Sequence, residues 1–240
     1  MYGWLMTARP VVHVLTDGSG NGGRPRIGST STLLSALAAS PGSIFGRLSD
    51  REIYSELLAR NHARFIALVD EIAADLVAHG VELVAGDAVE GFNPSHDVCR
   101  YIINAAVRLA SRAGERRIAC YAFPLDGAPH TCPGGVRDAA LRVELDETML
   151  DQKLRAARGY AELHAEVETT LSRFGTAPFR TECLWPGDLD DPYAWNPDQI
   201  PFYESYGSRR VASGAYERVV TFRQHVKPLA DALWCHSVAG

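Results

Sequence analysis

The chain has 240 residues and a mass of 26.2 kDa, a length that suits one large α/β domain or two small ones. Its net charge is -5, and no basic stripe is visible, which argues against a nucleic-acid or anionic-membrane partner. The five cysteines are scattered without a C-x-x-C pair, which favours reduced thiols in the cytoplasm. No signal-peptide pattern opens the chain, and no run of about 18 apolar residues predicts a membrane span.

The first half of the sequence alternates apolar, β-branched runs with helical patterns. The run Pro10–Leu15 ends at Thr16-Asp17-Gly18, and Ser49 with Glu52 forms a capping box at a helix start. Pro41–Arg47 is predicted to be a connecting loop. We expect strands at 10–15, 81–84 and 117–123, and helices at 29–39, 49–79 (one helix or a pair) and 98–113. This order predicts parallel strands joined by right-handed crossovers.

The second half has a different texture. Leu141–Leu145 alternates apolar and polar residues, which predicts a half-exposed strand. A long helical pattern over 146–174 follows, then a loop-rich stretch at 177–207 and a terminal helix at 219–233. We therefore expect one α/β domain over residues 1–240, with a core of mostly parallel, helix-flanked strands at 1–140 and a loop-rich C-terminal extension at 141–240.

The stretch most informative about function runs from Gly86 to Cys99 and reads Gly-Asp-Ala-Val-Glu-Gly-Phe-Asn-Pro-Ser-His-Asp-Val-Cys. It connects a predicted strand to a predicted helix and carries carboxylates and His96. Open α/β proteins place their chemistry in such loops, at the carboxyl ends of strands. A structural interpretation stays open beside the functional one. His96 could satisfy a local backbone group, Asp97 is a first-turn carboxylate favoured by the helix dipole, and Asp17 is a common turn former.

Three ordered motifs carry a resemblance to a known family. The strand ending Thr16-Asp17-Gly18 resembles the second strand of the PIG-L/LmbE-type N-deacetylases, and the loop Glu90–His96 resembles their Gly-Gly-His-Pro-Asp-His motif. The segment Val143–Asp146, followed by Lys153, Ala157 and Tyr160, is similar to their late strand and Lys-containing helix. The resemblance covers roughly Pro10 to Leu163.

The resemblance implies a Rossmann-like fold, a zinc ion at the carboxyl edge of the sheet, and hydrolysis of an acetamide on an amino sugar or related small molecule. His96 occupies the position of a zinc ligand. Asn93 stands where the family has a histidine that steadies the oxyanion, a role that an amide donor can also fill. Asp17 and Asp97 are the further candidates for catalytic roles. Substrate contacts are predicted for Glu90, Ser95, Tyr203 and Glu204, and Ser95 stands where the family motif has an aspartate.

One motif of the family is missing from this sequence. The family opens with Ala-His-Pro-Asp-Asp-Glu, which supplies two metal ligands and a general base, whereas Met1–Arg9 contains no His or Asp. Catalytic zinc usually takes three protein ligands, so the ligand set here is incomplete. Either the start of the sequence is misplaced, or a first βα unit is lost. In the second case a neighbouring strand edge needs cover, either from Tyr2–Leu5 or from a second protomer in a homo-oligomer.

Three functional hypotheses therefore stay open. The first is a zinc-dependent N-deacetylase that acts on an N-acetylated sugar or another small molecule. The second is a non-catalytic relative that binds a small molecule or a partner protein after loss of its metal centre. The third is an unrelated α/β fold whose loops mimic the family by chance.

Overall fold

The computed structural model describes residues 1–20, 23–126, 128, 130–196 and 198–239. The chain forms two compact units, each built from two separate segments. The first unit comprises Met1–Ser49 and Gly127–Trp185, and the second comprises Asp50–Asp126 and Pro186–Gly240. Residues 21 and 22 of the predicted glycine-rich loop lie outside the described residues.

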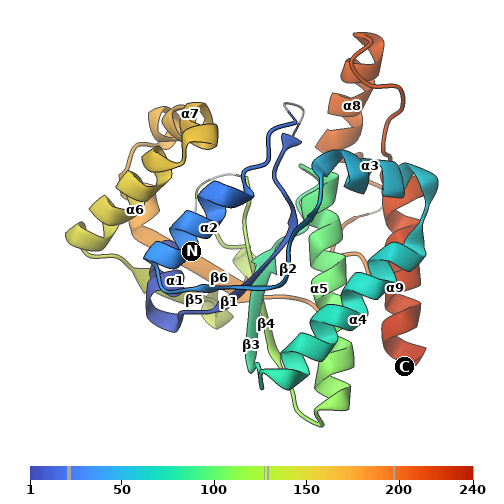
Figure 1. Cartoon of the computed structure of the whole chain (residues 1–240), viewed down its shortest axis with the longest axis horizontal. Helices are drawn as coiled ribbons and strands as arrows, with labels where there is room; N and C mark the ends of the chain where they lie inside the picture. The colour runs from blue at the N-terminus through green and yellow to red at the C-terminus, as the bar shows by residue number, and fades with distance from the viewer. Residues whose placement is uncertain (21–22, 127, 129, 197, 240) are drawn as a thin grey trace. The chain divides into compact units, whose positions relative to one another are not determined.

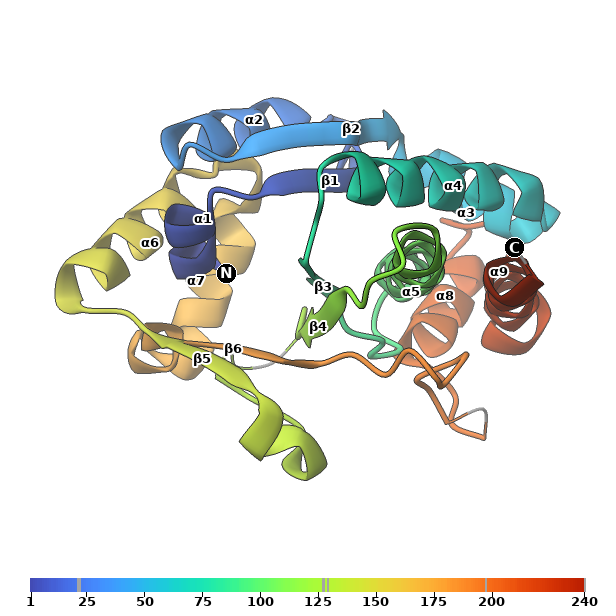
Figure 2. The same ribbon diagram turned by 90° about the horizontal axis from the view of Figure 1, so that it is seen from below.

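The amino-terminal part of the first unit is a parallel strand pair with a connecting helix. Helix α1 (Tyr2–Ala8) precedes β1 (Val11–Thr16), and α2 (Ile27–Ala36) leads to β2 (Ser40–Leu48). Figure 2 shows β1 and β2 side by side with α2 against β2.

The prediction of a connecting loop at Pro41–Arg47 is wrong, because these residues lie within β2. The pairing of β2 with β1 has register shifts, and Gly46 adopts a positive φ of 65°. These irregularities let a segment with the residue composition of a loop form a strand.

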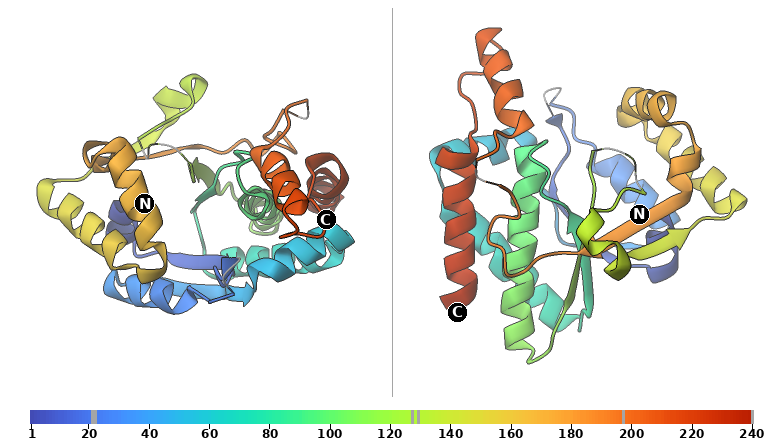
Figure 3. Two further views of the ribbon diagram at one scale, coloured as in Figure 1. Left: turned by 90° about the horizontal axis from the view of Figure 1, so that it is seen from above. Right: turned by 180° about the vertical axis from the view of Figure 1, so that it is seen from behind.

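The other segment of the first unit combines an antiparallel strand pair with a helical pair. Strand β5 (Leu141–Glu144) pairs with β6 (Thr181–Pro186), and α6 (Glu147–Gly159) lies beside α7 (His164–Phe174) (Figure 3). The long helical pattern predicted over 146–174 therefore forms two helices. Tyr160 ends α6 with a ψ of 91°, which breaks the helical path. The prediction of an irregular stretch at 177–207 is wrong over β6.

A buried carboxylate joins several parts of the first unit. Glu182 on β6 is 1% exposed and contacts the Lys153 ammonium at 2.9 Å and the Met1 amino group at 3.0 Å. It also accepts a hydrogen bond from Gly3 N at 3.0 Å. Burial raises the pKa of this carboxyl, but the two cations outweigh burial and leave the pKa below its ordinary value.

The second unit places helices around two parallel strands. Strands β3 (Leu83–Asp87) and β4 (Ala119–Phe123) pair in parallel from Leu83 opposite Ala119 to Asp87 opposite Phe123. The helices of this unit are α3 (Asp50–Ala59), α4 (His62–Ala78), α5 (Pro94–Ala113), α8 (Phe202–Ala212) and α9 (Lys227–Ala239), the last preceded by a π-helical turn at Phe222–Val226. Figure 1 shows α4, α5 and α9 side by side. Of the two alternatives predicted for residues 49–79, the structure shows the pair of helices. The predicted parallel pairing is confirmed for β3 with β4, whereas β1 pairs with β2, which was not predicted to be a strand. The Rossmann-like arrangement stays a prediction.

Helix α5 is the centre of the second unit. Its buried positions include Val98, Ile102 and Ala105, each at most 2% exposed, at the spacing of one helical face. A Cβ at Gly86 would lie 2.3 Å from Ile103 Cδ1, so glycine at this position allows α5 to pack closely against β3. Within the described part of the chain, no helix is both long and apolar enough to cross a membrane.

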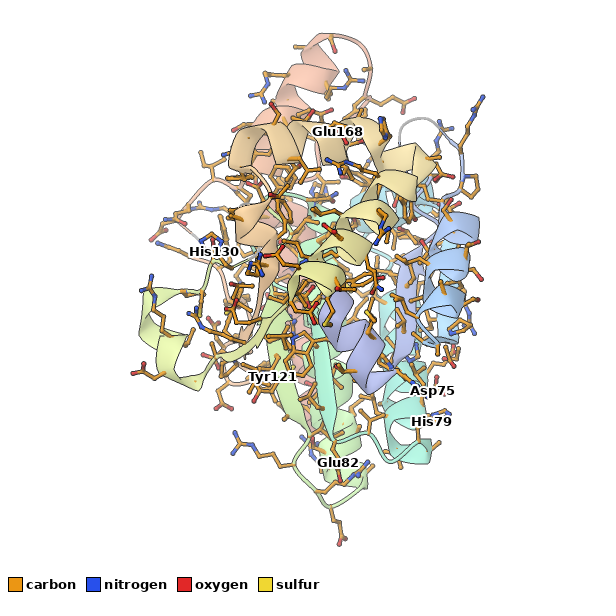
Figure 4. All side chains as sticks on the ribbon, turned by 90° about the vertical axis from the view of Figure 1, so that its left-hand side faces the viewer. Asp75, His79, Glu82, Tyr121, His130 and Glu168 are labelled. Atoms are coloured by element: carbon orange, nitrogen blue, oxygen red, sulfur yellow. The ribbon has the colours of Figure 1, made fainter. Side chains whose placement is uncertain are left out.

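The two ends of the parallel pair differ in what surrounds them. Asp75 and His79 lie near the end of α4, and Glu82 directly precedes β3, at the amino-terminal end of the strands (Figure 4). Asp87 ends β3 at the opposite, carboxyl end. The loop to α5 starts there, so the predicted functional loop lies at the edge that the sequence indicates.

A buried arginine holds this carboxyl edge together. Arg100 on α5 is 2% exposed. Its guanidinium donates to Gly86 O at 2.6 Å, to Tyr121 O at 2.8 Å and to Asp87 O. One cation therefore satisfies carbonyl groups of both strands, and these bonds offset its desolvation.

We expect Arg100→Met to lower the free energy of unfolding by about 3 kcal/mol or more, because three carbonyls of β3 and β4 would lose their donor. Chemical denaturation followed by circular dichroism measures the change. The exposed Arg51→Met on α3 is the control and should stay within about 0.5 kcal/mol of wild type. Equal stability of the two variants would contradict this account of the strand ends.

Candidate functional site

The candidate site is a carboxylate–imidazole pair at the carboxyl end of β3. His96 Nδ1 lies 2.9 Å from Asp87 Oδ2, and the His96 side chain is 36% exposed. An ionised carboxylate only accepts hydrogen bonds, so the proton of this bond belongs to Nδ1. That tautomer leaves Nε2 as the ring nitrogen with a free lone pair.

The main chain on both sides of the pair fixes its geometry. Asp87 is the last residue of β3, and its carbonyl is held by Arg100. His96 lies in the first turn of α5, where its backbone N–H bonds Asn93 O at 3.2 Å. Burial raises the pKa of the Cys99 thiol, one turn along α5, and the nearby Asp87 raises it further. A strand end and a helix start, both well ordered by backbone bonds, therefore set the imidazole against the carboxylate.

The carboxylates around His96 change its proton affinity. Burial lowers the pKa of the imidazole, but the hydrogen bond and charge of Asp87 outweigh burial, with help from Asp97 and Asp50. The pKa of His96 is therefore raised above its ordinary value. A raised pKa means that the protonated form of the imidazole is stabilised by its surroundings. A side chain that accepts a proton during a reaction needs such stabilisation.

Asn93, predicted to steady an oxyanion, is the N-cap of α5. Its Oδ1 accepts from Ser95 N at 3.1 Å and from Ser95 Oγ at 2.8 Å, and Tyr54 Oη lies 3.5 Å away. Ser95, predicted to contact substrate, is therefore engaged in the cap. With Oδ1 occupied, the Nδ2 group of Asn93 is the part of the side chain left to donate.

Asp97, predicted to be catalytic, is buried beneath the loop at 2% exposure. Its carboxylate accepts from Glu90 N at 3.0 Å and from Gly91 N at 3.2 Å. Burial raises the pKa of this carboxyl to about 7, against the effect of the two N–H donors. These contacts give Asp97 a structural role, because it ties the middle of the loop to the first turn of α5.

Glu90, predicted to contact substrate, bridges two loops of the second unit. Its Oε2 accepts from Leu125 N at 2.8 Å and from Asp126 N at 3.2 Å, both just beyond β4. Burial raises its pKa, and the charges of Asp126 and Asp87 add to this effect. Glu90 therefore connects the loops that follow the two parallel strands.

The two predicted substrate contacts on α8 are turned away from solvent or already bonded. Tyr203 is 6% exposed, and its hydroxyl lies buried with no hydrogen-bond partner among the described residues. Burial raises its pKa, and the nearby Asp97 and Tyr101 raise it further. Glu204 Oε1 accepts from Phe222 N at 2.6 Å. Tyr203 N bonds Gly91 O at 3.3 Å, so α8 is docked on the loop that carries His96.

Asp17 belongs to the first unit, whereas His96 belongs to the second. Its Oδ1 accepts from Ser19 N at 2.9 Å, and its backbone bonds Leu48 O at 2.8 Å and Arg26 N at 2.7 Å. These bonds are those of a turn-forming aspartate, so the structural interpretation accounts for its contacts. Its predicted catalytic role stays a prediction.

A zinc ion needs more ligands than this site provides. His96 Nε2 offers one ligand, and catalytic zinc usually takes three from the protein. Among the described residues, no three His, Cys, Asp or Glu side chains come together as a metal site. The described residues therefore do not fit a three-ligand zinc centre.

Two functional residues of the site were not predicted from the sequence. Asp87 was part of the informative stretch, but its pairing with His96 depends on where β3 ends. Nothing in the sequence around Arg100, which lies one helical turn after His96, indicates that its side chain bonds the strands. A histidine nine positions after a strand-end aspartate, across a helix start, was the pattern that could have indicated the pair.

The chain has little detectable similarity to known proteins. No family model and no curated protein matches the chain. Among solved structures, the crystal structure of the A40926 pseudoaglycone deacetylase Dbv21 is similar, with 19% sequence identity and a TM-score of 0.44. The alignment covers 74% of this chain and 81% of that one. A likeness of this size carries no argument about the site.

We expect Gly91→Ala to destabilise the site loop by about 1–3 kcal/mol. Gly91 has a φ of +62°, and a Cβ there would lie 2.4 Å from the rigid Trp195 ring. Gly159→Ala, at a helical position with open space, is the matched control and should be neutral or slightly stabilising. Thermal melts compare the two, and a Gly91→Ala protein as stable as wild type would contradict the tight turn.

We expect the pKa of His96 to fall when Asp87 is replaced by Asn, because the charge and the acceptor that raise it are both weakened. The raised pKa means that the pair stabilises the fold fully below the unfolded pKa, and that this contribution is lost as pH rises through the folded pKa. NMR titration of the His96 ring in wild type and Asp87→Asn measures the shift. An unchanged pKa would show that Asp87 is not its partner.

Proposed function

We propose that this protein is a hydrolase of the deacetylase type, which removes an N-acyl group from a small molecule. The observation that carries the proposal is the Asp87–His96 pair, a half-exposed imidazole oriented by a carboxylate at a helix entrance. The motifs around Asp17, His96 and Lys153 support an N-acyl substrate through their resemblance to the PIG-L/LmbE-type deacetylases. Dbv21 is described as a deacetylase, although the proposal does not depend on that likeness.

In the proposed reaction His96 Nε2 accepts a proton from the water that attacks the acyl carbon. Asp87 keeps the proton on Nδ1, so that Nε2 is the basic atom, and it stabilises the imidazolium that forms. The imidazolium then gives its proton to the departing amine. The bond from carbon to nitrogen breaks, and the products are a carboxylic acid and a free amine.

Asn93 supplies the donor that such a reaction needs. Its Oδ1 is fixed by Ser95, so the amide plane is held and Nδ2 is presented from the same turn that carries His96. A donor placed in advance at the oxyanion lowers the barrier because it needs no reorganisation during the reaction.

Zinc stays a prediction from the sequence resemblance. The described residues provide one ligand at this site rather than three, so no step of the mechanism above depends on a metal. Elemental analysis of purified wild type and His96→Ala tests the prediction directly. Zinc bound by wild type and absent from the variant would assign His96 as a ligand.

The activity test uses N-acetylated amino sugars and aryl acetamides, with released amine and released acetate both measured. We expect His96→Gln to lower kcat by about 10²-fold or more and Asp87→Asn to lower it by about 10-fold or more. His236→Gln is the matched control, since His236 also pairs with an aspartate, Asp70, at 2.6 Å but lies on α9.

Each variant is first checked for an unchanged thermal melt, so that loss of activity is not loss of fold. The assay is run with and without added zinc. Full activity of His96→Gln, or no hydrolysis of any N-acyl compound under either condition, would overturn the proposed function. Binding without hydrolysis would instead favour the non-catalytic hypothesis.

A further inference from the structure

An exposed row of aromatic rings lies beside the candidate site in the second unit. The row consists of Phe92, Phe202 and Tyr206, which are 40%, 48% and 38% exposed. Phe92 and Phe202 stack with centroids 5.3 Å apart and planes within 6°, and Phe202 and Tyr206 stack at 6.0 Å. We call these three side chains the aromatic row. Burying a large apolar side chain contributes about 1.5–3 kcal/mol. A ligand that covers the exposed rings would therefore gain free energy of this size for each ring.

The helix that carries the row adds a cation to it. Phe202, Tyr206 and Arg209 stand at positions i, i+4 and i+7 of α8, which lie on one helical face. The Arg209 guanidinium lies 5.8 Å from the Phe202 ring and 6.0 Å from the Tyr206 ring. No carboxylate pairs with Arg209 in the part of the chain that the structure describes. The row therefore ends in a cation that has ring contacts but no counter-ion among the described residues.

The aromatic row is continuous with the loop of the candidate site. Phe92 lies in that loop, between Gly91 and the N-cap Asn93, and four positions before His96. The hydrogen bond from Tyr203 N to Gly91 O joins the start of α8 to the same loop. Tyr54 lies against the same loop, because its hydroxyl is 3.5 Å from Asn93 Oδ1.

We propose that the aromatic row with Arg209 binds the part of the substrate distant from the scissile amide, and that this part is a flat ring bearing an anionic group. The ring would stack on the exposed aromatic faces, and the anion would pair with the guanidinium. This inference rests on the proposed function for the position of the amide, but it makes a claim about binding that can be measured without turnover. It also moves the predicted substrate contacts on α8 from Tyr203 and Glu204 to Phe202, Tyr206 and Arg209.

The test measures binding of three probes to the full chain by NMR or calorimetry. The probes are 4-acetamidobenzoate, which has both ring and anion, neutral acetanilide, and uncharged N-acetylglucosamine. We expect 4-acetamidobenzoate to bind most tightly. Arg209→Gln should weaken it by about 10-fold and leave acetanilide unchanged, whereas Phe202→Leu should weaken both aromatic probes by about 3-fold or more.

Arg155→Gln, an exposed arginine on α6 of the first unit, controls for the change in net charge and should bind like wild type. His96→Gln should also keep its affinity for 4-acetamidobenzoate, which separates this inference from the proposed function. Equal binding of all three probes, unchanged affinity in Arg209→Gln and Phe202→Leu, or no saturable binding of any probe would overturn the inference. Tight self-association that is lost in Phe202→Leu would also overturn it, because a second copy would then cover the row.

Discussion

The hydrogen bond between the Asp87 carboxylate and His96 Nδ1 joins two elements whose positions are fixed independently. Asp87 is held because Arg100 bonds carbonyls at the end of β3 and within β4. His96 is held because Asn93 caps α5 one turn earlier. Neither side chain needs to order its own surroundings, so little conformational entropy opposes their contact. The geometry of the pair is therefore a consequence of how the strand end and the helix start are built.

The acidic residues of the loop have two different roles. Asp97 and Glu90 bond the backbone of the loops, whereas Asp87 bonds the imidazole of His96. Asp97 and Glu90 each accept two backbone N–H groups, and such groups would otherwise be unsatisfied at a turn. Asp87 instead bonds a side chain, the imidazole of His96. Burial raises the pKa of Asp97 and Glu90 alike, which shows that a shifted pKa alone does not identify the residue that acts in chemistry.

Much of the second unit could be predicted from local sequence patterns. The strand before the loop and the long helix after it follow from apolar runs and capping residues. The parallel pairing of β3 with β4 follows from the alternation of strands with helices. The predicted start of α5 at Val98 was late, because Asn93 and Pro94 form a cap and first position that read as loop. Strand β2 was missed because its proline and glycines are typical of turns, and pairing with β1 outweighs that tendency.

The candidate site could be predicted only in part, for a related reason. His96 and Asn93 carry a local signal, since both stand at a helix entrance after a strand. The partner of His96 depends on a contact across nine positions, and the exposure of Phe202 rather than Tyr203 depends on how α8 is turned against the loop. Such contacts are set by packing, and packing is not visible in residue spacing alone.

The protonation of the His96 ring is the most direct test of this account. Nitrogen-detected NMR of the imidazole, at a pH above its raised pKa, distinguishes which ring nitrogen carries the proton. We expect the proton on Nδ1 in wild type. In Asp87→Asn we expect the neutral ring to lose its preference for the Nδ1-protonated tautomer. A neutral ring protonated on Nε2 in wild type would contradict this account, because Asp87 would then not be the acceptor and Nε2 would not be free to take a proton from water.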